Sequence, residues 1–130
     1  MAADPLPRLR KLCLGLPDAH EVEAWGAPTF RIRNRLFAMY SAPDHGKDEI
    51  RPAVWCVAGP GNQRLMVESN PARFFVPPYV GPSGWVGIWL DRRPPWKAIE
   101  QLIRDAYEII EAKGPGRKPS QAKKKKRKPR

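Results

Sequence analysis

The chain has 130 residues, of which 42% are hydrophobic, and carries a formal net charge of +11. This length suits one domain with its own core and is short for two. The charge is uneven: residues 113–130 hold ten Lys/Arg and no acid, whereas residues 1–112 hold 14 basic and 13 acidic residues. We therefore expect a nearly neutral domain over 1–112 and a basic tail over 113–130 that is disordered by itself.

Cysteine content and hydropathy exclude several classes of protein. Cys13 and Cys56 lie in separate apolar stretches without a CxxC or Cys/His pattern, so we expect buried free thiols rather than a disulfide or zinc site. No apolar run approaches the roughly 20 residues that span a bilayer, and the N-terminus lacks the core of a signal peptide. We expect a cytoplasmic protein, nucleoid-associated if bacterial, with no membrane partner and assumed to be monomeric.

The first half of the chain predicts one helix followed by extended segments. The expected elements are a helix over 7–15, a loop over 16–21, extended chain from Val22, a hairpin over 29–39 and a polar, mobile loop over 43–49. The helix assignment rests on Pro7, which suits a first helical turn, and on Gly15, which suits a helix end.

The second half predicts two strands and two helices. The expected elements are a buried central strand over 53–59, a helix over 63–69 capped by Asn62 and stopped by Asn70–Pro71, an irregular loop over 73–84, a strand over 85–91 and a long helix from Pro94–Pro95 to Ala112. The apolar stripe of the long helix is formed by Ile99, Leu102, Ile103, Ala106 and Ile110. Trp85 and Trp89 share a strand face, and Gly87 between them favours close packing by another element.

These elements predict a fold class. Helices at both ends of four or five strands indicate a single compact α+β domain. Its sheet should be mainly antiparallel and flanked by the N- and C-terminal helices, because no connection between the early strands is long enough for a parallel crossover.

The hairpin TFRIRNRLFAM, residues 29–39, carries a charged alternation. A two-residue turn at Asn34–Arg35 would pair Ile32 with Phe37 and Phe30 with Met39, which places these four apolar side chains on the core face. The opposite face would then carry Arg31 and Arg33 about 7 Å apart, close to the spacing of successive phosphates on a nucleic-acid strand. The other interpretation is an ordinary half-buried strand whose outer face is solvated.

The sequence lacks the usual patterns of catalysis. GxSxG, GxGxxG and GxxxxGK do not occur, and His20 and His45 stand in separate polar segments without metal-ligand spacing. The stretch AGPGNQ could hold an anion on its backbone, but the pattern is weak and favours a plain turn. We therefore expect no catalytic residue, no metal and no cofactor, and a protein that is not an enzyme.

Three segments together resemble a known family. Within residues 10–112, the order and separation of three segments are similar to those of the MmcQ/YjbR-like proteins. The segments are LPDAHEVEAWGAPTFRIRNRLFAMY, RFFVPPYVGPSGWVGIWLD and WKAIEQLIRDAYEII. The resemblance implies a compact α+β fold and DNA binding through a double-wing arrangement. The family often has Gly-Lys at the hairpin turn, where this chain has Asn34-Arg35, and often a basic element after the helix tyrosine, where this chain has the acidic EIIEAKG after Tyr107. The basic tail lies outside the resemblance.

These observations lead to a functional hypothesis of non-enzymatic DNA binding with low sequence specificity. The hairpin would act as a basic wing and the tail would bind phosphates. The expected contact residues are Arg31, Arg33, Arg35, Lys113, Arg117, Lys118, Lys123, Lys124, Lys125, Lys126, Arg127, Lys128 and Arg130. We expect DNA rather than RNA only because of the family resemblance. A lysine-rich tail recognises the negative charge that both nucleic acids carry.

Two other hypotheses remain open. The domain could bind a small ligand or perform an unknown reaction in a pocket near Tyr79 and Trp85, with the tail serving only to localise it to nucleic acid. It could also be a protein-interaction module whose tail binds RNA or ribosomes.

Overall fold

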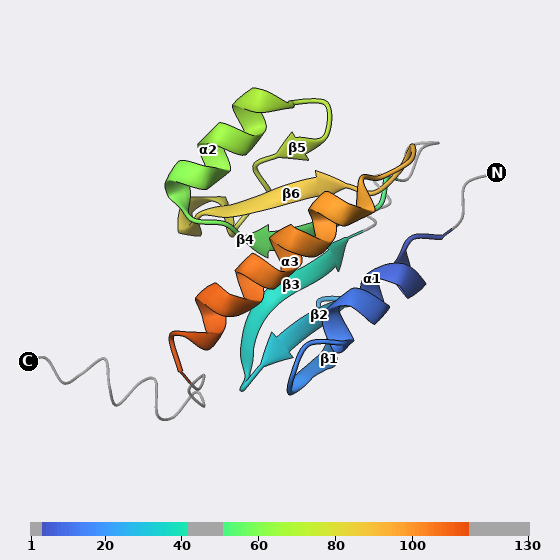
Figure 1. The fold of residues 1–130 in the computed structure, drawn as a ribbon, viewed down its shortest axis with the longest axis vertical. Coiled ribbons are helices and arrows are strands. Elements are labelled where there is room, and N and C mark those ends of the chain that lie inside the picture. The colour runs from blue at the N-terminus through green and yellow to red at the C-terminus, as the bar shows by residue number, and fades with distance from the viewer. Residues whose placement is uncertain (1–3, 42–50, 115–130) are drawn as a thin grey trace, which may run out of the picture.

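The computed structural model describes residues 4–41 and 51–114 (Figure 1). The helices are α1 (Leu6–Leu14), α2 (Pro60–Ser69) and α3 (Trp96–Glu111), with a 3-10 turn, η1, at Gly81–Ser83. The strands are β1 (Ala19–Ala24), β2 (Ala27–Ile32), β3 (Arg35–Ser41), β4 (Ala53–Val57), β5 (Phe74–Phe75) and β6 (Trp85–Trp89). The loop expected over 43–49 and the tail beyond Gly114 lie outside the described residues.

The strands form one sheet of six in the order β1-β2-β3-β4-β6-β5, and each neighbouring pair is antiparallel. Figure 1 shows α3 crossing the sheet beside α1, with α2 next to β5 and β6. The prediction of an α+β domain with a mainly antiparallel sheet and terminal helices is confirmed. The sheet has more strands than the four or five expected.

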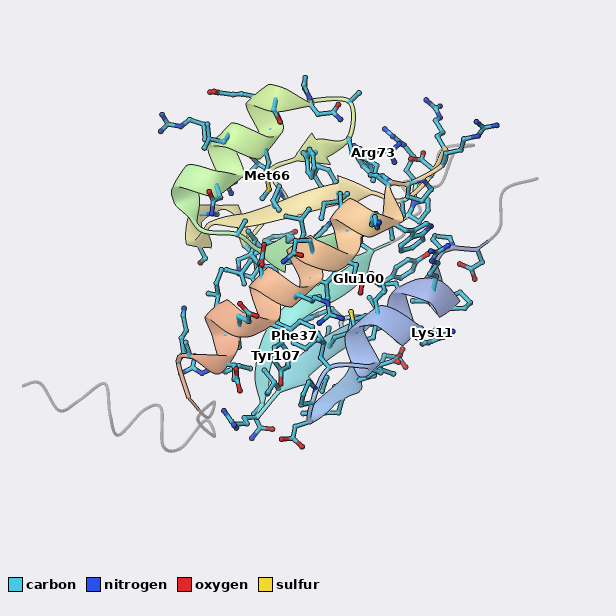
Figure 2. The ribbon with its side chains drawn as sticks, in the orientation of Figure 1. Lys11, Phe37, Met66, Arg73, Glu100 and Tyr107 are labelled. Atoms are coloured by element: carbon cyan, nitrogen blue, oxygen red, sulfur yellow. The ribbon has the colours of Figure 1, made fainter. Side chains whose placement is uncertain are left out.

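The core lies between the sheet and α3. Ile99, Ile103, Ala106 and Ile110 are buried as predicted, whereas Leu102 is only partly buried. Phe37 of β3 is fully buried and meets Tyr107 of α3 edge-on, with ring centroids 5.5 Å apart (Figure 2). Burial of an apolar stripe of this kind supplies most of the stability of such a helix.

The two cysteines are buried and unpaired with each other, as expected. Burial raises the pKa of both the Cys13 and the Cys56 thiols, because a thiolate is poorly solvated in the core. Both therefore stay protonated at neutral pH and are unsuited to act as nucleophiles.

The predicted register of the hairpin is wrong, although its apolar core is right. The turn lies at Arg33–Asn34, with positive φ at both residues (50° and 70°), and Ile32 pairs with Arg35. Phe30 pairs with Ala38 and Arg31 with Leu36, which leaves Phe37 as an extra residue in a β-bulge. Alternation from Arg35 already places Phe37 on the core face, where it is fully buried, and the bulge shifts the pairing by one residue beyond it. Met39, expected in the core, pairs instead with Thr29 and is only partly buried.

Two boundary predictions also need correction. The loop expected over 16–21 ends early, because β1 begins at Ala19 and its residues pair with β2. Helix α2 begins at Pro60, not after Asn62, since proline suits a first helical position. Asn62 is thus inside the helix, and its side-chain amide donates to the Ala58 carbonyl at 3.1 Å.

Gly87 of β6 allows the close contact that its position between Trp85 and Trp89 predicted. Its neighbour is the ring of Phe75 on β5: a Cβ built on Gly87 would lie 2.2 Å from a ring carbon. Phe75 also stacks on Trp89, with ring centroids 4.3 Å apart. The short strand β5, which the sequence indicated only as irregular loop, is therefore packed against β6 by its aromatic side chains.

We expect Gly87→Ala to destabilise the fold by about 1–3 kcal/mol, because the added methyl group must displace the Phe75 ring. Chemical denaturation measures this change. Gly61→Ala is the matched control. A Cβ at Gly61 would meet no atom within 4 Å, and alanine favours the helix there, so this variant should be neutral or more stable. Equal effects of the two substitutions would contradict the packing of β5 on β6.

Candidate functional site

The ends of the strands define two ends of the molecule. At the first, here called the hairpin end, lie the turn between β2 and β3, the end of α3 and the loop that leads into β6. At the opposite end lie the turn between β1 and β2 and the loop that leads into α3. Those residues expected to bind DNA that the structure describes lie at or near the hairpin end, which is therefore the candidate site.

Arg33 is exposed at the tip of the turn, where it and Asn34 both adopt the left-handed conformation. Such a two-residue turn matches the twist of the flanking strands but costs energy at an arginine, which has a Cβ. The tip therefore holds a basic side chain that projects beyond the sheet.

Arg31 lies on the open face of the sheet, opposite the helices α1 and α3. It pairs across strands with His20 and Leu36, and its Nε donates to the Thr29 hydroxyl at 3.2 Å. Thr29 in turn donates to the Val22 carbonyl and is fully buried. Arg31 is thus a partly buried residue with an oriented guanidinium group.

Arg35 points to the other face. Its Nε donates to the Gly114 carbonyl at 3.1 Å, just beyond the end of α3. This bond ties the start of β3 to the second residue of the basic tail, next to the exposed Lys113. The structure therefore brings Arg33, Arg35 and Lys113 to one end, but it does not place Arg31, Arg33 and Arg35 in the single row that the alternation suggested.

Carboxylates also occur at the hairpin end. Tyr107 donates to the Pro17 carbonyl at 2.6 Å. Burial is the main cause that raises the pKa of its hydroxyl, helped by Glu111 and Asp18 and opposed by Arg33. The hairpin end is therefore of mixed charge within the described residues. The remaining predicted contact residues lie outside those residues, from Arg117 to Arg130.

The two residues proposed for the alternative pocket differ in burial. Tyr79 is 91% exposed, whereas Trp85 is buried. A cleft of about 350 Å³ lies elsewhere, between α2 and α3. Its lining residues are Val57, Ala58, Asn62, Met66, Leu102, Asp105, Glu108 and Ile109.

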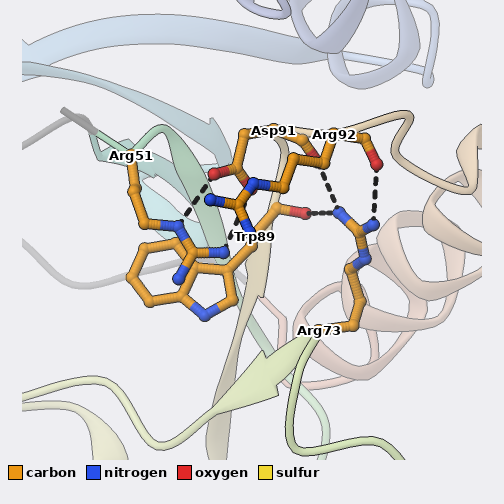
Figure 3. Close-up of polar contacts among 5 residues, drawn as sticks. All are labelled: Arg51, Arg73, Trp89, Asp91 and Arg92. Carbon is orange, nitrogen blue, oxygen red and sulfur yellow. Dashed lines mark hydrogen bonds and ion pairs between the residues drawn. The ribbon is translucent and has the colours of Figure 1, made fainter. Parts of the chain in front are cut away.

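Sequence reasoning missed a cluster of arginines at the opposite end (Figure 3). Arg73 donates to the carbonyls of Trp89, Asp91 and Arg92 at 2.8–3.0 Å. Arg51 lies over the Trp89 ring at 4.0 Å and forms an ion pair with Asp91. The hydrogen bond from Arg51 is the main cause that lowers the pKa of the Asp91 carboxyl.

This cluster holds a strained loop in place. Arg92 and Arg93 both have positive φ, an uncommon conformation for residues with a Cβ. The bonds from Arg73 fix the backbone of this turn before Pro94–Pro95 and α3. The consecutive DRR of residues 91–93 was the available signal, but it does not reveal that Arg73 binds from another element.

Neither a metal-binding cluster nor a membrane-spanning helix is found in the part of the chain that the structure describes. No group of three or more His, Cys, Asp or Glu residues there could hold a metal ion. No helix among those residues is long and apolar enough to cross a membrane.

The fold and the hairpin end define a small α+β protein with one six-stranded antiparallel sheet and an arginine-bearing hairpin. The family model described as YjbR matches residues 14–109, and the chain belongs to the YjbR family. Its fold is similar to that of the Deinococcus radiodurans protein DR2400, whose domain is described as DUF419, with a TM-score of 0.68. The two share 20% identity over 92% of this chain and 86% of that chain. No match is found among curated proteins.

Proposed function

We propose that this protein binds DNA without catalysing a reaction, through phosphate contacts from the hairpin end and the basic tail, and with low sequence specificity. The observation that carries the proposal is the bond from Arg35 to Gly114. It makes the tail, with nine further Lys/Arg, start beside the hairpin turn. Both sets of cations can therefore engage one stretch of the same polyanion.

The chemistry of these groups favours backbone contact over base reading. Arg33 is an exposed, long and flexible side chain at a turn tip, which suits a phosphate better than the fixed geometry of a base edge. Lysine and arginine in a tail neutralise phosphates and release counterions, whatever the sequence of the nucleic acid. The expected result is salt-sensitive binding with little preference among sequences.

The distribution of acids indicates which side faces the DNA. The solvent side of α3 carries Glu100, Asp105, Glu108 and Glu111, and Glu100 is already paired with Arg104. A phosphate backbone is repelled from that side. Arg31 and Arg33 are instead reached from the hairpin end and the open face of the sheet, away from these carboxylates.

We expect the double variant Arg31→Ser/Arg33→Ser to weaken duplex binding and to lower the slope of log affinity against log salt by about 2 units, because each lost phosphate contact removes about 0.9 unit. A salt titration of the full chain on one duplex measures both quantities. The fold should be retained, since the exposed Arg33 contributes little to stability and the hydrogen bond from Arg31 to Thr29 contributes only about 0.5–1.5 kcal/mol.

The matched control is Arg64→Ser/Lys97→Ser, which removes two exposed cations from α2 and from the start of α3. Its salt slope should match that of the unmodified chain. If both double variants change the slope equally, only net charge matters and the hairpin has no part in binding.

A further inference from the structure

Tyr79 combines two unfavourable features. It is the most exposed large apolar side chain of the described residues, at 91%, and its φ is +67°, in the left-handed region. An exposed aromatic ring gains no burial energy, and a residue with a Cβ is strained in this conformation. Glycine would serve the backbone better at this position. Strain of this kind clusters at functional sites.

The loop around Tyr79 is anchored on both sides. Pro77 is fully buried before it, and Gly81 is buried after it, where a Cβ would lie 2.6 Å from Val76. Gln63 of α2 donates one side-chain amide to the carbonyls of Gly81 and Trp85, at 2.8 and 2.6 Å. The Tyr79 ring is therefore presented to solvent by a fixed backbone rather than by a loose loop.

The same loop belongs to the hairpin end. The Gly84 carbonyl accepts bonds from the backbone N–H groups of Ala58 and Gly59, both at 2.9 Å. Ala38, near the start of β3, pairs with Cys56, and the next residue, Val57, pairs with Trp85 at the start of β6. The start of β3 and the start of β6, which the Tyr79 loop precedes, are therefore two strand spacings, about 10 Å, apart.

We propose that Tyr79 stacks on an unpaired base of a nucleic-acid strand whose phosphates are held by Arg33. This inference rests on the proposed function and adds a substrate class: single-stranded nucleic acid, or DNA with unpaired bases. An aromatic face accepts any base, because every base has a π-surface, so stacking adds affinity without sequence preference. Bases within an intact duplex are already stacked on one another and leave the ring without a partner.

Stacking and phosphate contact differ in their dependence on salt. Phosphate contacts release counterions and set the salt slope, whereas a ring on a base releases none. Loss of Tyr79 should therefore lower affinity at every salt concentration by the same factor. Loss of Arg33 should change the slope. This difference separates the two contributions in one experiment.

The test compares the full chain with its Tyr79→Gly variant on an oligothymidylate of about 20 nucleotides and on a duplex of equal length, a probe long enough for one small domain. We expect affinity for the single strand to fall about five- to tenfold, with the salt slope unchanged and duplex affinity unaltered. The melting temperature should not fall, because glycine relieves the strained φ. A drop in binding without a drop in melting temperature excludes unfolding as the cause.

Trp25→Gly is the matched control. Trp25 is 77% exposed with φ of +54°, but it lies in the turn between β1 and β2 at the opposite end. Its loss should leave both affinities unchanged, and Tyr79→Phe should bind like the original chain. Equal single-strand affinity of the original chain and Tyr79→Gly would overturn the role of Tyr79 while the proposed function stands. An original chain that binds neither probe would overturn both.

Discussion

Phe37→Ala should destabilise the protein by about 3–5 kcal/mol, the largest effect on stability that we expect from a single substitution. Phe37 is fully buried and contacts Tyr107 edge-on, so its truncation leaves a cavity between β3 and α3. Urea denaturation of the two proteins measures the difference.

Leu36→Ala is the control for the face assignment. Leu36 is the adjacent residue of the same strand, is only partly buried and pairs with Arg31 on the open face. Its truncation should cost less than half as much, because burial on that face is incomplete and a smaller cavity results. A larger loss from Leu36→Ala than from Phe37→Ala would contradict the assignment of Phe37 to the core face.

Deletion of residues 115–130 should weaken duplex binding by at least about tenfold at low salt and flatten the salt dependence, since nine Lys/Arg are removed with no acid. The cut follows Gly114 because that carbonyl accepts the bond from Arg35. Stability should change by less than about 0.5 kcal/mol, as for other surface changes. A salt titration and a thermal melt provide the two measurements.

Two further variants test why the deletion weakens binding and where the tail begins to matter for stability. A chain of full length with the nine basic tail residues changed to Gln should behave like the deletion, because charge and not length supplies the affinity. A cut after Ala112 should also lower the free energy of unfolding by about 0.5–1.5 kcal/mol, because Arg35 loses its acceptor. This is the usual contribution of one hydrogen bond. Unchanged affinity and slope after removal of the tail would refute its role.

Much of the fold could be predicted because local patterns and core burial agree. The apolar stripe of α3, the strand over Ala53–Val57 and the burial of Phe30, Ile32 and Phe37 all follow from periodicity and composition. The hairpin turn was misplaced by one residue because Arg33–Asn34 and Asn34–Arg35 are both plausible turn pairs by residue type. Only the pairing of both strands with their neighbours, including the bulge, selects the first.

Some features of the candidate site are likewise determined by the sequence alone, and others only by the tertiary structure. Net charge and its concentration after residue 113 belong to the sequence by itself, and so does the exclusion of common catalytic motifs. The meeting of Arg35 with Gly114, 79 residues later, depends on how α3 lies across the sheet. The same holds for Arg73, which binds three carbonyls of the loop before α3. Periodicity reports which face a residue takes within its own element, but which elements share an end is decided by strand order and packing, and these arise only when distant segments bury a common core.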